Sequence, residues 1–230
     1  MLKSNHVYER NKNMLAYANE EQLELPGIID YSKDKWEIKI DYDEYSGSPR
    51  DWDNLGEICV SSRCKYTKDE SGLADSECLE WSNAEADQKA LEDKGYIVLP
   101  LSVYDHSGVS IYIGGICDRW DSGQIGWYIA SKEKIREEYK VKRISKKLLE
   151  KVINVMTSEV ETYNHYINGE VYTFTLSHNG EEVDSCGGFY DSDDKYLGFL
   201  EEMYEYFPDE FRKAFTVEQA KELCDLPWQR

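Results

Sequence analysis

The sequence YIVLPLSVYDHSGVSIYIGGICDRWDSGQIGWYIA, residues 96–130, contains the longest apolar runs of the chain and is the basis of our fold prediction. Two of its segments, 97–104 and 109–113, are rich in β-branched and aromatic residues, and residues 105–108 between them have turn composition. This pattern predicts two antiparallel strands. With a third strand predicted over 125–130, the stretch should form a meander in the middle of a sheet.

The segments around this stretch predict further strands and one long helix. Residues 36–42 alternate apolar and polar side chains, as a half-buried strand does. In residues 145–167 apolar side chains recur at spacings of three and four, which predicts a helix with one buried face. Strand-like alternation resumes at residues 170–176, and the pair Asn179-Gly180 then predicts a hairpin.

These elements do not follow a regular βαβ order, so we predict an α+β fold. In this fold an antiparallel sheet is covered on one face by the long helix, and a short helical acidic segment follows at the C-terminus. The predicted organisation has three parts: a loosely ordered acidic N-terminal segment (1–34), an α+β core domain (35–190) and an acidic, aromatic, helical C-terminal segment (191–230).

Composition is typical of a folded, soluble protein. The 230 residues are 40% hydrophobic and include 18 tyrosines, so the chain can bury a substantial core. The sequence has no signal-peptide pattern and no apolar run of about 20 residues, which predicts a cytoplasmic protein without a membrane span. Its six cysteines are scattered without a CxxC pair, and in that compartment they are expected to be reduced.

Charge is the clearest physical signal for function. The 46 acidic residues outnumber the 27 basic ones, and the net charge of -19 opposes direct binding to nucleic acid or to anionic membranes. Residues 132–151 contain nine basic and four acidic side chains, whereas residues 181–210 contain eleven acidic side chains and one lysine. Such runs are often only solvated faces. Alternatively, clustered carboxylates imitate nucleic-acid phosphates and attract a basic cleft of a partner protein.

In this second interpretation the acidic surface lies in the C-terminal segment, where carboxylates alternate with tyrosines. Tyrosine adds apolar contact area that charge alone does not provide. The residues predicted to bind the partner are Asp191, Asp193, Asp194, Glu201, Glu202 and Glu205, with Tyr196 and Tyr204 as anchors.

An enzymatic alternative rests on one cysteine and a histidine. Cys186 lies in a glycine-rich turn sequence. His106 lies in the predicted turn 105–108 with Asp105 beside it, and Asp121 lies just before the predicted strand 125–130. A cysteine nucleophile with histidine as its base and aspartate to orient the histidine is a known chemical arrangement. In the alternative interpretation His106 and Asp121 are ordinary turn residues and Cys186 is a small buried side chain.

The sequence predicts no cofactor and no metal site. Structural zinc sites usually show two closely spaced ligand pairs, and only one loose pair, Cys59 and Cys64, is present. Aspartates such as Asp51 and Asp53 do not follow the regular alternation of a calcium-binding loop. Phosphate-binding glycine loops, nucleophile elbows and HExxH motifs are also missing.

Five motifs resemble a family of uncharacterised proteins encoded by bacteriophages, prophages and conjugative elements. The resemblance covers about residues 36–190. The motifs are SPRDWDNLG (48–56), LPLSVYDHSG (99–108), WDSGQIGWYI (120–129), KIREEYKVKRISKKLLEKV (134–152) and EVDSCGGFY (182–190). Small acidic accessory proteins of mobile elements often resemble inhibitors of host defence, so the resemblance implies an anti-defence role inside a bacterial host cell.

The sequence thus leads to one principal functional hypothesis and two alternatives. The principal hypothesis is an anti-defence protein that inhibits a nucleic-acid-directed nuclease, such as a CRISPR effector or a restriction enzyme, by occupying its basic cleft. One alternative is a hydrolase or transferase that uses Cys186 and His106. The other is a non-catalytic regulator that binds a host protein through the basic helices, with Lys142, Arg143, Lys146 and Lys147.

Overall fold

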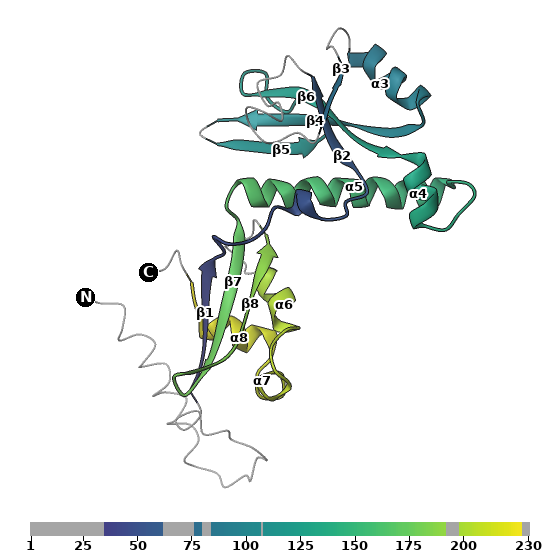
Figure 1. Cartoon of the computed structure of the whole chain (residues 1–230). Helices are drawn as coiled ribbons and strands as arrows, with labels where there is room; N and C mark the ends of the chain where they lie inside the picture. Colours follow the sequence, from purple (N-terminus) through teal and green to yellow (C-terminus); the bar gives the residue numbers. More distant parts are fainter. Residues whose placement is uncertain (1–34, 62–75, 80–83, 107, 192–197, 227–230) are drawn as a thin grey trace, which may run out of the picture. The chain divides into compact units, whose positions relative to one another are not determined.

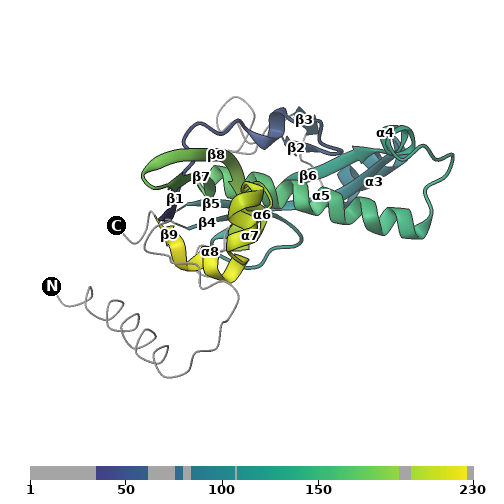
Figure 2. The ribbon, with the colours of Figure 1, turned by 90° about the horizontal axis from the view of Figure 1, so that it is seen from below.

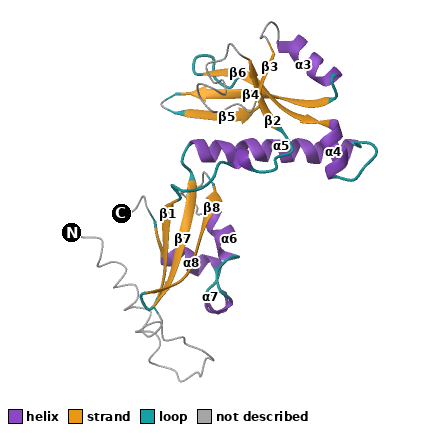
Figure 3. Cartoon of the chain, in the orientation of Figure 1, coloured by secondary structure: helices purple, strands orange, loops and turns teal. Residues whose placement is uncertain are grey.

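The computed structural model describes residues 35–61, 76–79, 84–106, 108–191 and 198–226. Residues Trp36–Arg230 form one compact unit, and its described part contains two β-sheets and six α-helices (Figures 1 and 3). The predicted α+β class is confirmed. The prediction of a single sheet is wrong, because the strands divide between two sheets with separate hydrophobic cores.

The first sheet is built around the stretch that predicted it. Its strand order is β3-β2-β6-β4-β5. The strands are β2 (Glu57–Ser61), β3 (Ser76–Leu79), β4 (Tyr96–Asp105), β5 (Val109–Ile113) and β6 (Ser122–Ser131). β2 and β3 pair in parallel, and the other neighbours are antiparallel.

The predicted meander is wrong in its order, because β4 and not β5 lies in the middle of the three strands. β4 pairs with β5 on one side and with β6 on the other. Burial explains this order: β6 has six consecutive buried residues, whereas β5 has a single buried residue, Ile111. The strands with continuous apolar runs occupy the interior of the sheet, and the short half-exposed strand forms its edge.

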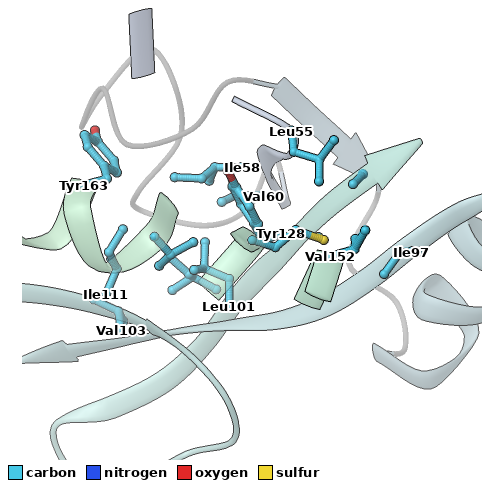
Figure 4. Packing of buried hydrophobic residues seen from close by; sticks show 14 of the residues in the cluster. Leu55, Ile58, Val60, Ile97, Leu101, Val103, Ile111, Tyr128, Val152 and Tyr163 are labelled. Atoms are coloured by element: carbon cyan, nitrogen blue, oxygen red, sulfur yellow. The ribbon is translucent and has the colours of Figure 1, made fainter. Parts of the chain in front are cut away.

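The long helix α5 (Lys146–Ile167) begins and ends as its sequence pattern predicts. Ser145 caps it, since its hydroxyl accepts a hydrogen bond from the backbone N–H of Leu148 at 3.2 Å. Its buried side chains Val152, Met156, Val160 and Tyr163 share one hydrophobic cluster with side chains of β2, β4, β5 and β6 (Figure 4). The helix is preceded by the short α4 (Lys132–Glu138), which Ser131 caps.

A smaller cluster contains side chains of the same sheet and of α3 (Ala84–Asp93). Its buried members include Leu91 of α3, Val98 of β4 and Trp127 of β6, together with Cys59 of β2. Cys59 is disulfide-bonded, and its partner lies outside the described side chains. The expectation that all six cysteines are reduced is therefore wrong for Cys59.

The second sheet has the strand order β8-β7-β1-β9. Its strands are β1 (Trp36–Tyr42), β7 (Val171–His178), β8 (Glu181–Tyr190) and β9 (Cys224–Asp225). The predicted hairpin between β7 and β8 is confirmed, with Asn179 and Gly180 both at positive φ, as a two-residue hairpin turn requires. β1 pairs with β7 along its whole length, from Trp36 opposite His178 to Tyr42 opposite Tyr172.

The C-terminal helices pack on this second sheet. They are α6 (Gly198–Tyr204), α7 (Asp209–Ala214) and α8 (Val217–Leu223). Figure 2 shows the three helices next to one another beside this sheet. Phe199, Leu200 and Phe211 from these helices share a core with Ile38 and Phe174 of the sheet. The described residues 198–226 therefore form three helices, supply half of a hydrophobic core and add the strand β9.

Candidate functional site

The predicted acidic surface is only partly visible in the described residues. Asp193, Asp194 and Tyr196 lie outside them. Asp191 is half-buried, and its backbone N–H donates to the carbonyl of Glu170 at 3.3 Å. Glu201, Glu202 and Glu205 are exposed on α6 and just after it, as predicted for a binding surface.

Ion pairs compensate part of this acidic charge. Lys221 Nζ lies 3.3 Å from a carboxylate oxygen of Glu201. Arg212 contacts Glu205 at 3.6 Å and Asp209 at 2.8 Å. Four other exposed carboxylates have no ion-pair partner within the described part of the chain, namely Glu202, Glu210, Glu218 and Glu222. Since exposed pairs are weak, the region keeps an acidic surface, but the uncompensated carboxylates are not the set predicted from the sequence.

Tyr204 was predicted as a surface anchor, but the structure places it against the second core. Its hydroxyl donates a hydrogen bond to the carbonyl of Phe215, and its ring lies 5.9 Å from that of Phe207. This role for Tyr204 is therefore corrected from partner contact to packing. Tyr206, two residues later, is 55% exposed, so within the described residues it presents an aromatic ring to solvent near these carboxylates.

His106 and Asp121 meet at the predicted rim of the first sheet. Nδ1 of His106 lies 3.1 Å from a carboxylate oxygen of Asp121, and the backbone N–H of Asp105 donates to the Asp121 carbonyl at 2.8 Å. The two segments meet because β4 pairs with β6, so the end of β4 lies beside the start of β6. The predicted proximity of these three residues is confirmed.

Cys186 does not join this pair. It lies on β8 of the second sheet, opposite Phe174, and its thiol is 3.7 Å from the carbonyl of Gly187. Within the described residues, neither His106 nor Asp121 contacts it. The structure therefore does not assemble the Cys186–His106–Asp121 arrangement considered from the sequence.

A different cysteine lies in the loop beside His106 and Asp121. Cys117 is exposed between β5 and β6, and the hydroxyl of Tyr112 donates to its sulfur at 3.1 Å. The Tyr112 hydroxyl, followed by that of Ser122, lowers the pKa of the Cys117 thiol. A lower pKa raises the thiolate fraction at neutral pH and hence the reactivity of the sulfur.

Asp118 holds this loop in place. One of its carboxylate oxygens accepts from the backbone N–H groups of Trp120 at 2.7 Å and of Asp121 at 3.0 Å. These two hydrogen bonds, and then the nearby His106, lower the pKa of Asp118. The sequence analysis did not identify Cys117 as a reactive thiol. The available signal was its position five residues after Tyr112, since the Gly-Gly pair between them allows a turn that brings the two side chains together.

We expect Cys117 to be the fastest-labelled thiol of the native protein, and Tyr112→Phe to slow its labelling. Loss of the hydroxyl raises the pKa of Cys117, so the labelling rate at pH 7 should fall by a factor of about 3–10. The labelling rates of the native protein and of Tyr112→Phe should converge at a pH above the pKa of Cys117 in both proteins. Iodoacetamide labelling followed by mass spectrometry, as a function of pH, measures this directly.

Cys224 provides the internal reference for this experiment, since burial raises its pKa to about 12. It should label slowly in both proteins. An unchanged pH profile in Tyr112→Phe would show that the Tyr112 hydroxyl does not control the thiol.

Glu159 on α5 is the centre of a dense hydrogen-bond network. Its carboxylate accepts hydrogen bonds from the backbone N–H of Leu55 at 2.6 Å, the N–H of Gly56 at 3.1 Å and the hydroxyl of Tyr128 at 2.6 Å. Arg50 donates to the same Tyr128 hydroxyl at 3.0 Å and to the Gly56 carbonyl at 3.2 Å. This network fastens the loop after β1 to α5 and to β6.

The fastened loop and α5 enclose a groove of about 350 Å³. The loop includes the short 3-10 helix η2 (Pro49–Asp51), and Trp52 directly after it is 54% exposed. The residues that line the groove are Pro49, Trp52 and Asn54 from the loop, and Lys151, Asn154, Val155, Ser158, Glu159 and Thr162 from α5. The sequence motif SPRDWDNLG thus forms one wall of a concave surface, which its composition alone did not indicate.

No protein-family model matches the chain. Searches of curated proteins and of solved structures also find no match. The resemblance to proteins of mobile elements therefore stays a prediction. Among the described residues, no helix is long and apolar enough to cross a membrane.

Proposed function

We propose that the protein is an anti-defence factor of a bacteriophage or mobile element, which inhibits a nucleic-acid-directed nuclease by occupying its basic cleft. The observation that carries this proposal is the set of exposed carboxylates on the C-terminal helices. All seven acidic side chains of residues 201–222 are exposed, and four of them have no ion-pair partner within the described residues. The net charge of -19 supports the same kind of partner.

In this proposal α5 is the cover of the first sheet, and residues 191–230 are the acidic segment that the partner contacts. Because α6, α7 and α8 are held by the second core, their outward carboxylates stand on a fixed scaffold. A preorganised surface loses less conformational entropy on binding than a flexible tail does. The cleft of a nuclease supplies the Arg and Lys side chains that match such a surface.

The proposal predicts that Glu202→Lys, Glu210→Lys and Glu222→Lys together abolish inhibition. These side chains are exposed and unpaired in the described structure, so their reversal should shift the melting temperature by only about 2 °C or less. Inhibition of DNA cleavage by a panel of restriction enzymes and CRISPR nucleases, measured at low and high salt, is the assay. The wild type should inhibit one of them, and less strongly at high salt.

A matched control reverses three exposed carboxylates of the first-sheet region, Glu133, Glu137 and Glu161. This variant has the same net charge as the first one and should still inhibit. Equal loss in both variants would indicate a nonspecific effect of charge, and full inhibition by the first variant would exclude the proposed surface.

A second candidate function, thiol-dependent hydrolase or transferase chemistry, is favoured by the His106–Asp121 pair. Here Cys117 replaces Cys186 as the proposed nucleophile, because Cys117 and Asp121 belong to one loop network held by Asp118. The distinguishing result is simple. Cys117→Ser leaves inhibition by the acidic surface intact, but it removes any activity that depends on the thiol.

A further inference from the structure

We propose that the groove between residues 49–54 and α5 binds a small anionic ligand with a planar ring, of the mononucleotide class. This inference is independent of the nuclease-inhibitor proposal, since it involves other residues and needs no protein partner. Lys151 and Thr162 are eleven positions apart on α5, so the groove follows the helix for about 16 Å. Its volume of about 350 Å³ falls in the range of small-ligand sites.

Trp52 offers the surface for a planar ring. Its indole meets the ring of Tyr190 nearly perpendicularly, with centroids 5.5 Å apart, and still leaves the side chain 54% exposed. The backbone of Trp52 is held on both sides, because its N–H donates to the Pro49 carbonyl of η2 and Asn54 donates to its carbonyl at 3.3 Å. A fixed, half-exposed indole is the kind of aromatic surface on which nucleobases stack.

Two polar side chains of the groove have unused hydrogen-bonding groups. The amide of Asn154 and the hydroxyl of Ser158 make no side-chain hydrogen bond within the described residues, and both line the groove one turn apart on α5. An asparagine amide can pair with the edge of adenine or with sugar hydroxyls, and a serine hydroxyl can do the latter. These groups give the site more specificity than an apolar surface would have.

Charge places the anionic part of the ligand at the Lys151 end. Nζ of Lys151 lies 5.1 Å from the centre of the Tyr139 ring, a contact that positions the ammonium group without an ion pair. Residues 132–151 carry the local excess of basic side chains, including Lys147 one turn before Lys151. The carboxylate of Glu159 also lines the groove, but its oxygens already accept hydrogen bonds from Leu55, Gly56 and Tyr128.

The ligand must be small because the whole protein is strongly acidic. A net charge of -19 repels a polyanion such as DNA or RNA, whereas a single phosphate can be balanced by Lys151 at one end of the groove. The proposed ligand places a planar base on Trp52, a sugar beside Asn154 and Ser158, and one phosphate at Lys151.

The test is a titration of the full-length protein with adenosine 5′-monophosphate, adenosine and inorganic phosphate, followed by the NMR signals of the indole N–H groups. We expect adenosine 5′-monophosphate to shift the Trp52 signal, adenosine to do so with at least about fivefold weaker affinity, and phosphate alone to leave it unchanged. Trp120 is 87% exposed and does not line the groove, so its signal should not move in any titration.

Three variants separate the roles within the groove. Asn154→Ala should weaken binding, and alanine at this exposed helical position preserves folding. Lys151→Ser should remove the advantage of the monophosphate over adenosine, whereas the matched Lys147→Ser, outside the groove lining, should retain it. Trp52→Ala, followed by calorimetry because its reporter is lost, should abolish binding.

Several results would overturn the inference. They are the absence of a Trp52 shift at millimolar monophosphate, equal shifts for Trp52 and Trp120, and unchanged affinity in both Lys151→Ser and Asn154→Ala. A response to inorganic phosphate as strong as that to the nucleotide would indicate an adventitious anion site and would also contradict it.

Discussion

Gly126→Ala should destabilise the protein by about 3 kcal/mol or more, because β6 and β2 approach each other too closely at this position for any side chain. A Cβ atom on residue 126 would lie 2.2 Å from the backbone carbonyl oxygen of Cys59 and 2.9 Å from the Cα of Val60. Both atoms belong to a strand backbone, so neither can move without breaking the pairing of Val60 with Gly126. Overpacking at a rigid site costs about 1–3 kcal/mol, and contact with backbone lies at the upper end or beyond.

Urea unfolding followed by circular dichroism measures this effect, and the melting temperature should fall by about 10 °C for a unit of this size. Gly123→Ala is the matched control, since it lies on the same strand and its added Cβ would meet no atom within 4 Å. It should change stability by less than about 0.5 kcal/mol. Equal midpoints for the two alanine variants would show that the strands do not approach as closely as described.

The secondary structure was predictable where local patterns determine it. The period-two alternation of Trp36–Tyr42, the spacing of apolar residues in Lys146–Ile167 and the Asn179-Gly180 turn each led to the correct element. The assignment of strands to sheets was not predictable in this way. It depends on which apolar faces meet, and Ile38 of β1 shares a core with Phe174 and Phe211 from segments more than 130 residues away in the sequence.

The candidate sites were likewise predictable only where local patterns determine them. His106 and Asp121 were predicted to meet because turns at the ends of neighbouring strands meet at one rim, and strand composition identified those turns. Tyr204 was predicted to be exposed because it stands among carboxylates, yet helix periodicity turns it towards Phe207 and Phe211. Glu159 gave no sequence signal, because a glutamate on an exposed-looking helix face is usually solvated.

Glu159→Ala should destabilise the protein by about 3 kcal/mol, because three hydrogen-bond donors then lose their acceptor together. Leu55 and Tyr128 are almost fully buried, so neither the Leu55 N–H nor the Tyr128 hydroxyl can turn to water. A buried donor left without a partner costs about 1–3 kcal/mol, and hydrogen bonds to a charged group are the stronger ones. Burial also raises the pKa of Tyr128, so its hydroxyl stays protonated and continues to require an acceptor.

The loss should spread to the loop that Glu159 fastens. Without the carboxylate, the Gly56 N–H is released and Arg50 remains as the other tie between this loop and Tyr128. Amide hydrogen exchange should therefore accelerate at Leu55 and Gly56 before it accelerates in β2, and a double-mutant cycle with Tyr128→Phe should give a coupling of about 1 kcal/mol or more. Glu161→Ala, two positions further along α5 and exposed, is the matched control and should be nearly neutral. If the two glutamate variants unfold at the same urea concentration, the carboxylate of Glu159 does not hold the loop, and the wall of the groove must be fixed by Arg50 and Trp52 instead.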